Sequence, residues 1–186
     1  MRTYTKKSFP ADKARRYLEP GPVILISSAH KGERNIMTCG WHMMLGYEQV
    51  GCFIWDQNHS HEMIRRSREC VINVPTAAMV KTVIDIGNHH ARRGEKIDKF
   101  ERFGLTAVPG TKVKAPLIAE CPASFECRLI DASLVKRYSL FVFEIIAAHA
   151  AKSPKYPTTI HYRGEGVFMI AGSSVSYRSR FKPGRM

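Results

Sequence analysis

Short apolar segments separated by turns fill residues 22 to 55 and limit the fold to one built on antiparallel strands. Val23–Ile26 is a continuous apolar run, which is typical of a strand buried on both faces. A turn at His30–Glu33 leads into a second strand, and Val50–Trp55 supplies a third. Strands with such short connections form a meander, as found in β-barrels and β-sandwiches.

Helical patterns are inserted among the later strands. Apolar periodicity predicts helices over 12–18, from Ser60 onward with Ser60 as N-cap, over 77–86 with Gly87 ending the helix, and over 98–103 closed by Gly104. Apolar runs predict strands over 70–74, 123–130, 140–148, 159–162 and 167–170. The chain has no G-x-G-x-x-G motif and no regular strand–helix alternation. We therefore predict a mainly β fold, an antiparallel barrel with inserted helices, as a single domain over residues 1–186.

Composition argues against several classes of protein. The apolar fraction of 44% fits a folded chain, and no apolar run approaches the ~18 residues of a membrane helix. The N-terminus lacks the apolar segment of a signal peptide, so we expect a cytoplasmic protein without membrane association. The five cysteines contain no C-x-x-C pair and are expected to be reduced and mostly buried. The histidines lack metal-ligand spacing, so no metal site is expected.

The net charge of +13 has three explanations. Clustered Lys and Arg can neutralise the phosphates of nucleic acid, but here the basic residues are dispersed and no nucleic-acid-binding motif is present. A basic surface can also attract a phosphorylated small molecule. The third explanation is a soluble surface that is basic without a specific partner. Charge alone leaves these open, and nucleic acid is not expected as the partner.

The stretch Asn35–Trp41 departs from the pattern of a structural strand. It places small or hydrogen-bonding residues where bulky core residues would be expected, and it ends in an indole. Such a strand suits a wall that backbone and short side chains present to a planar ligand with polar edges. Taken singly, Asn35 would more often be a turn residue that satisfies its own backbone, and Trp41 would more often be a core residue.

Four features occur in a fixed order along the chain. They are Pro22–Ile26 followed by Asn35-x-x-Thr38-x-x-Trp41, then Ser60-x-x-x-Ile64 leading to Cys70-Val-Ile-Asn-Val-Pro75, then Asp98-Lys-Phe100, and last Leu140–Ile145 with a glycine-spaced strand after it. In these features the chain resembles the flavin reductase-like family of FMN-binding split barrels, in particular its flavoredoxin-type branch. The resemblance implies an antiparallel Greek-key split β-barrel. It also implies a homodimer with one FMN per subunit near the subunit interface.

The resemblance also assigns flavin-binding residues. The strand Asn35–Trp41 would contact the flavin, and Ser60 at a helix start would hold the phosphate with His59 and His61 beside it. Lys96 would supply a basic group, Tyr138 takes a position often held by histidine, and Phe168 would lie near the ring. The expected flavin-binding residues are Asn35, Met37, Thr38, Cys39, Gly40, Trp41, His59, Ser60, His61, Lys96, Tyr138 and Phe168.

Hydride transfer from NAD(P)H to flavin requires two stacked rings about 3–3.5 Å apart and no acid or nucleophile from the protein. We therefore expect no catalytic side chain. The first hypothesis is an NAD(P)H-dependent FMN oxidoreductase. The second is a flavoredoxin-type carrier that passes electrons between protein partners. The third, a nucleic-acid-binding protein, rests on the net charge alone.

Overall fold

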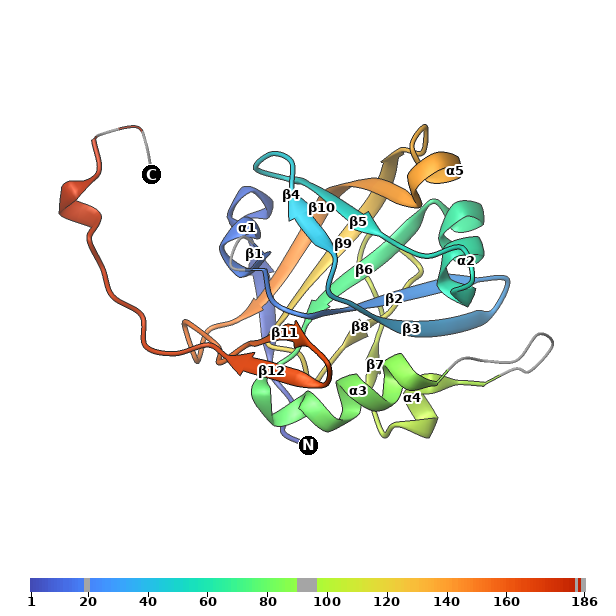
Figure 1. Cartoon of the computed structure of the whole chain (residues 1–186), viewed down its shortest axis with the longest axis horizontal. Coiled ribbons are helices and arrows are strands. Elements are labelled where there is room, and N and C mark those ends of the chain that lie inside the picture. Colours follow the sequence, from blue (N-terminus) through green and yellow to red (C-terminus); the bar gives the residue numbers. More distant parts are fainter. Residues whose placement is uncertain (19–20, 90–96, 183, 185–186) are drawn as a thin grey trace.

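The structure is a computed structural model that describes residues 1–18, 21–89, 97–182 and 184 (Figure 1). Its centre is an eight-stranded antiparallel sheet in the order β3-β2-β6-β9-β10-β5-β4, with β1 beside β10. The strands of this sheet are β1 (Lys6–Phe9), β2 (Ile24–His30), β3 (Glu33–Cys39), β4 (His42–Met44), β5 (Gln49–Phe53), β6 (Glu69–Val74), β9 (Ala123–Asp131) and β10 (Leu140–Ala151). The sheet curls on itself, and the predicted antiparallel split barrel is confirmed.

Smaller elements surround this sheet. Two separate hairpins are β7 (Ala107–Val108) with β8 (Leu117–Ile118), and β11 (Ile160–Gly164) with β12 (Val167–Ile170). The helices are η1 (Ala11–Lys13), α1 (Arg15–Leu18), α2 (His59–Ser67), η2 (Ala77–Met79), α3 (Val80–Asn88), α4 (Lys99–Arg102), α5 (Val135–Tyr138) and η3 (Arg178–Arg180). Inserted helices were therefore predicted correctly, whereas β1, β4, β7, β8 and α5 were not predicted.

The core is divided by the sheet into two main clusters. Inside the barrel, the alternating residues Phe141, Phe143 and Ile145 of β10 pack with residues such as Ile24 and Ile26. On the other face of β2, Leu25 packs with side chains from α3 and α4. Strand β2 is therefore buried on both faces, as its continuous apolar run predicted.

All five cysteines are buried, and none of them forms a disulfide bond, as predicted. Burial raises the pKa of the Cys39 thiol to about 11 and that of Cys121 to about 12. These thiols are therefore protonated and act as small apolar groups in the core.

Two predicted element ends were wrong. Helix α2 begins at His59, and Asn58 rather than Ser60 occupies the N-cap position. The Ser60 hydroxyl instead accepts a hydrogen bond from the side chain of Asn35. Gly87 does not end its helix, because α3 continues to Asn88. A Cβ atom at Gly87 would lie 3.5 Å from the Thr38 side chain, so this glycine marks a close approach of α3 to β3.

Other local predictions were correct. Lys31 and Gly32 have φ of 50° and 79° in the β2–β3 turn, which suits the twist of a hairpin. Asp98 caps α4 by accepting a hydrogen bond from the backbone N–H of Phe100 at 2.9 Å. Gly104 follows that helix with φ of 61°.

A buried carboxylate fixes the loop between β7 and β8 to the barrel. Glu126 of β9 is fully buried and accepts hydrogen bonds from the backbone N–H groups of Thr111, Lys112 and Val113 at 2.6–2.9 Å. The Thr111 hydroxyl and a ring nitrogen of His149 also bond to it, each at 2.7 Å. Burial by itself would raise the pKa of Glu126, but these hydrogen bonds outweigh it and lower the pKa to about 2.

We predict that Glu126→Gln lowers the free energy of unfolding by about 3 kcal/mol at neutral pH, because it removes the charge from these hydrogen bonds. Since the pKa of Glu126 is depressed in the folded state, its contribution is present above about pH 5 and is lost as the pH falls towards 2. Urea denaturation of both proteins between about pH 3 and pH 7 measures this. The exposed residue Glu165, changed to Gln, is the control. A difference that stays constant over this pH range would contradict the prediction.

Candidate functional site

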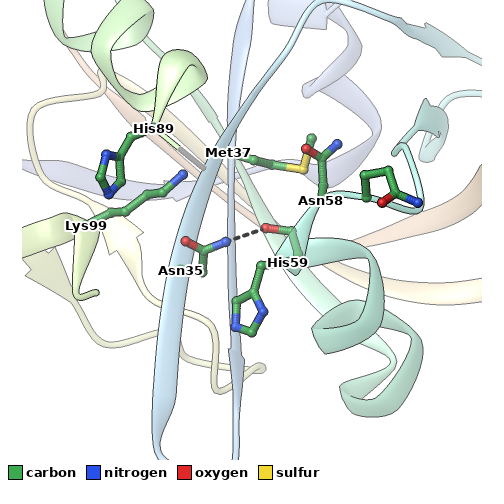
Figure 2. A pocket seen from close by; sticks show the side chains of 8 residues that line it. Asn35, Met37, Asn58, His59, His89 and Lys99 are labelled. Atoms are coloured by element: carbon green, nitrogen blue, oxygen red, sulfur yellow. Dashed lines mark hydrogen bonds between the residues drawn. The ribbon is translucent and has the colours of Figure 1, made fainter. Parts of the chain in front are cut away.

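A small polar pocket of about 30 Å³ lies between β3 and the start of α2 (Figure 2). Figure 2 shows Lys99 reaching across from α4 towards Asn35 and Met37, while Asn58 and His59 approach from the start of α2. The lining residues are Asn35, Met37, Gln57, Asn58, His59, Ser60, His89 and Lys99.

A buried hydrogen bond joins the two walls of this polar pocket. The Asn35 side-chain amide donates to Ser60 Oγ at 2.9 Å, and both side chains are buried. Because Ser60 Oγ accepts this bond, its own O–H can donate to a ligand. The N-terminus of α2 borders the pocket and carries a partial positive charge. This side of the pocket is therefore suited to an anion.

Lys99 supplies the positive charge on the other side of the polar pocket. Its side chain is only 5% exposed, and Nζ donates to the backbone oxygen of Ile86 at 3.2 Å. Burial lowers the pKa of Lys99 to about 8. The ammonium group is thus protonated at neutral pH and incompletely hydrated, so an anion in the pocket would stabilise it.

An ion pair holds α4, and with it Lys99, against β3. The Arg34 guanidinium donates to Asp98 Oδ2 from two nitrogens, at 2.7 and 2.8 Å, and lies 4.9 Å from the centre of the Phe100 ring. Burial alone would raise the pKa of Asp98, but the hydrogen bonds from Arg34 and from the Phe100 backbone hold it below its ordinary value. Asp98 therefore both caps α4 and anchors it.

A larger apolar pocket of about 310 Å³ lies between β3, α3 and the β11–β12 hairpin. Thr38 Oγ1 donates to the backbone oxygen of Val83 at 2.7 Å, which fixes α3 beside β3. On the hairpin, the Tyr162 and Phe168 rings have centroids 5.1 Å apart. The lining residues are Val23, Thr38, Gly40, Val83, Ile84, Gly87, Asn88, Tyr162, Gly166 and Phe168.

A third hollow shares one lining residue with each of the two pockets. This hollow, of about 260 Å³, shares His89 with the polar pocket and Asn88 with the apolar pocket. Within the described chain, β3 is the last strand of the sheet at this side, so its backbone on that edge pairs with no other strand. A ligand lying along this edge could therefore bond to backbone groups as well as to side chains.

Seven of the twelve predicted flavin-binding residues line these two pockets. Asn35, Met37, His59 and Ser60 line the polar pocket, and Thr38, Gly40 and Phe168 line the apolar one.

Four of the other five predicted residues lie elsewhere. Cys39 faces the core, and His61 packs edge-on against Phe141 with ring centroids 5.1 Å apart. Trp41 is 70% exposed, with its ring against Phe53, and Tyr138 is an exposed residue at the end of α5. Lys96 lies outside the described residues.

Sequence reasoning missed Lys99 and Tyr162, which line the polar and the apolar pocket. A signal for Lys99 was present, because it follows the capping Asp98 in the Asp98-Lys-Phe100 motif. Tyr162 carries no comparable local signal, since it is one of several aromatic residues in the late strands.

The arrangement suits a ligand with an anionic end and a flat, mostly apolar end. In the described ranges, no three His, Cys, Asp or Glu side chains group closely enough to hold a metal ion. No helix of the described chain is both long and apolar enough to cross a membrane.

Comparison with known proteins gives matches over most of the chain. A family model described as flavin reductase like domain matches residues 15–168. An uncharacterised protein of Pyrococcus abyssi is 33% identical over 134 residues, which is 71% of this chain and 75% of that protein.

Solved structures share the fold at lower identity. An FMN-binding domain of a flavin reductases-like enzyme from Shewanella baltica superposes with a TM-score of 0.85 at 24% identity, covering 95% of this chain and 99% of that one. The flavoredoxin of Desulfovibrio vulgaris (Miyazaki F) gives a TM-score of 0.77 at 21% identity, covering 86% of this chain and 91% of that one.

We predict that Lys99→Met raises the free energy of unfolding of the ligand-free protein by about 2–3 kcal/mol at neutral pH, because it removes a buried ammonium. The folded-state pKa of about 8 lies below the ordinary 10.5. As the pH rises from about 8 to 10.5, the free energy of unfolding of the wild-type protein therefore increases. The difference in stability between the variant and the wild-type protein then disappears. Chemical denaturation at about pH 7 and about pH 10 measures both values. The exposed Lys81, changed to Met, controls for the loss of one positive charge. Equal effects of the two substitutions would contradict the prediction.

Proposed function

The chain belongs to the flavin reductase-like family, and from this premise we propose that it is an FMN-binding oxidoreductase. The observation that carries the proposal is the polar pocket with Lys99 and Ser60 and the apolar pocket beside it, since both pockets are lined by residues of β3. FMN has matching ends, since its phosphate is a dianion and its isoalloxazine is a flat ring. The Shewanella domain named above, which is described as FMN-binding, supports the choice of this flavin.

In this proposal the polar pocket holds the phosphate end of FMN. The Ser60 hydroxyl and the α2 N-terminus donate hydrogen bonds to it, and the Lys99 ammonium supplies the opposite charge. His59 is partly exposed at the rim and adds a further donor. The pocket is narrow at about 30 Å³, so it would hold only this end of the ligand.

The ring end would lie in the apolar pocket. Thr38 and Gly40 form one wall, Val83 and Ile84 of α3 another, and Phe168 of the hairpin a third. The unpaired edge of β3 offers backbone donors and acceptors to the polar rim of the ring. These residues bind and orient the ring and exclude water from one of its sides. Bound FMN supplies the hydride and electron transfer chemistry, so the proposal assigns no catalytic side chain.

The source of electrons distinguishes two functions. The first is an NAD(P)H-dependent reductase, in which a nicotinamide ring stacks on the flavin. The second is an electron carrier, which the likeness to flavoredoxin favours. The basic surface would attract NAD(P)H or an acidic redox protein equally well.

We also propose a homodimer with the flavin near the subunit interface. The outer side of β4, β5 and the first half of β10 carries a contiguous apolar surface, here called the outer face. It consists of Trp41, Met43, Leu45, Phe53, Leu140 and Val142. Trp41 directly follows Gly40 of the apolar pocket, so a second copy on this face would lie next to the flavin.

We predict that Ser60→Ala raises the dissociation constant for FMN by about 10-fold, since it removes a donor to a charged group. Trp41→Ala should also weaken FMN binding, through loss of contact area at the interface. Quenching of flavin fluorescence measures binding, and circular dichroism with thermal unfolding checks that each variant is folded. Ser67→Ala on the same helix is the matched control. If both variants bind FMN as tightly as the wild-type protein, the proposed site is misplaced.

We predict that NADH or NADPH bleaches the visible absorbance of the FMN-loaded protein in anaerobic mixing, faster than it bleaches free FMN. This result is expected because the site would hold the flavin with one face open to a nicotinamide ring. Bleaching no faster than that of free FMN with either nucleotide would contradict the reductase and favour the electron carrier.

A further inference from the structure

After β12 the chain leaves the body of the molecule (Figure 1). Residues 172–182, here called the C-terminal arm, are all exposed. Ala171 N donates to the Thr159 oxygen at 2.9 Å, which is the last backbone hydrogen bond to the body in the described part of the chain. Among the described residues, the backbone hydrogen bonds of the arm itself lie within the single turn of η3. The arm is therefore not packed on its own subunit.

The composition of the C-terminal arm is that of a binding segment rather than of a solvated tail. It combines large apolar side chains with basic ones, and the apolar ones are more than half exposed to solvent. These side chains are Val175, Tyr177 and Phe181, interleaved with Arg178, Arg180 and Lys182. Aromatic and Arg side chains are the residues most enriched at the centres of protein interfaces.

The outer face has the complementary composition. Trp41, Met43 and Leu45 are 70%, 56% and 47% exposed. Met43 lies in β4, and Trp41 and Leu45 flank that strand, each joined to β5 by a backbone hydrogen bond of 2.9 Å. Gly51 keeps this surface continuous, since a Cβ atom there would lie 3.3 Å from Leu45 Cδ1 and 3.5 Å from Leu140 Cδ1. The outer face therefore forms one apolar platform across three strands.

Carboxylates border this platform, although the chain as a whole is strongly basic. Glu144 follows Val142 on the same side of β10, with Arg128 of β9 opposite it, and Asp131 pairs with Val142 across the sheet. Glu48 lies in the turn between β4 and β5. An apolar centre with three carboxylates along its border offers contacts to the apolar and basic side chains of the arm.

We propose that the C-terminal arm of one copy of this chain packs across the outer face of a second copy, and reciprocally. Tyr177 and Phe181 would cover Trp41 and Met43, while the arm's basic residues would pair with the bordering carboxylates. Eleven extended residues span at most about 36–40 Å, which is comparable to the width of a domain of this size. In Figure 1 the arm departs from the body without returning over β4, so a second copy is the occupant that satisfies both surfaces.

The inference adds a specific element to the proposed dimer. Because Trp41 adjoins the apolar pocket through Gly40, the arm of one copy would lie beside the ring end of the other copy's site. The arm exchange itself does not require bound FMN, so it can be tested on the ligand-free protein.

Disulfide trapping between two differently tagged chains tests the exchange. Met43→Cys in one chain and Val175→Cys in the other should give a covalent heterodimer on mild oxidation, because the native cysteines are buried. The control pairs a chain carrying Val167→Cys with the chain carrying Val175→Cys, because Val167 is 54% exposed and Met43 is 56% exposed. A chain carrying both Met43→Cys and Val175→Cys should form linked dimers. Linkage only within single chains, or no more linkage than in the control, would overturn the proposal.

Association measurements provide a second test. Truncation after Ala171, or the double change Tyr177→Ala and Phe181→Ala, should raise the dimer dissociation constant by about 10-fold or more in analytical ultracentrifugation. Tyr156→Ala is the control, since Tyr156 is 64% exposed and Tyr177 is 62% exposed. An unchanged dimer dissociation constant would overturn the proposal. The proposal would also be overturned if truncation changed only the binding of an oligonucleotide. FMN binding, measured in parallel, separates failure of the arm from failure of the proposed function.

Discussion

A buried hydrogen bond from Asn35 to Ser60 joins strand β3 to helix α2, and the polar pocket depends on it. Two further links leave the same strand. Arg34 pairs with Asp98 and so holds α4, while Thr38 bonds to the backbone of Val83 and so holds α3. One short strand at the edge of the sheet therefore positions three helices. Lys99, the α2 N-terminus and the apolar pocket all take their places from these links.

The edge position of β3 explains how one strand can position helices and also leave room for a ligand. A central strand gives both backbone edges to the sheet, whereas β3 pairs on one side with β2 and is followed by no further strand within the described residues. Its other side is left for helices and for a ligand. An exposed edge strand can pair with a strand of another chain, and the covering helices reduce this risk. A flat cofactor bound along the edge would reduce it further.

Much of the fold followed from local patterns, because strands such as β2 and turns such as Lys31–Gly32 are encoded by neighbouring residues. The errors arose where long-range contacts decide. Ser60 was predicted as a helix cap, but its hydroxyl is taken by Asn35, which lies 25 positions earlier. Gly87 was predicted to end a helix, but it allows the close approach of Thr38. Lys99 was missed because the ion pair between Arg34 and Asp98, 64 positions apart, orients α4.

The central claim is that FMN lies along β3 with its phosphate between Ser60 and Lys99. A crystal structure of the protein with FMN tests this most directly. The account predicts phosphate oxygens about 2.7–3.1 Å from Ser60 Oγ and Lys99 Nζ, and the ring against Thr38, Gly40 and Phe168. A flavin bound with its phosphate elsewhere, or both pockets empty of flavin at saturating FMN, would contradict it.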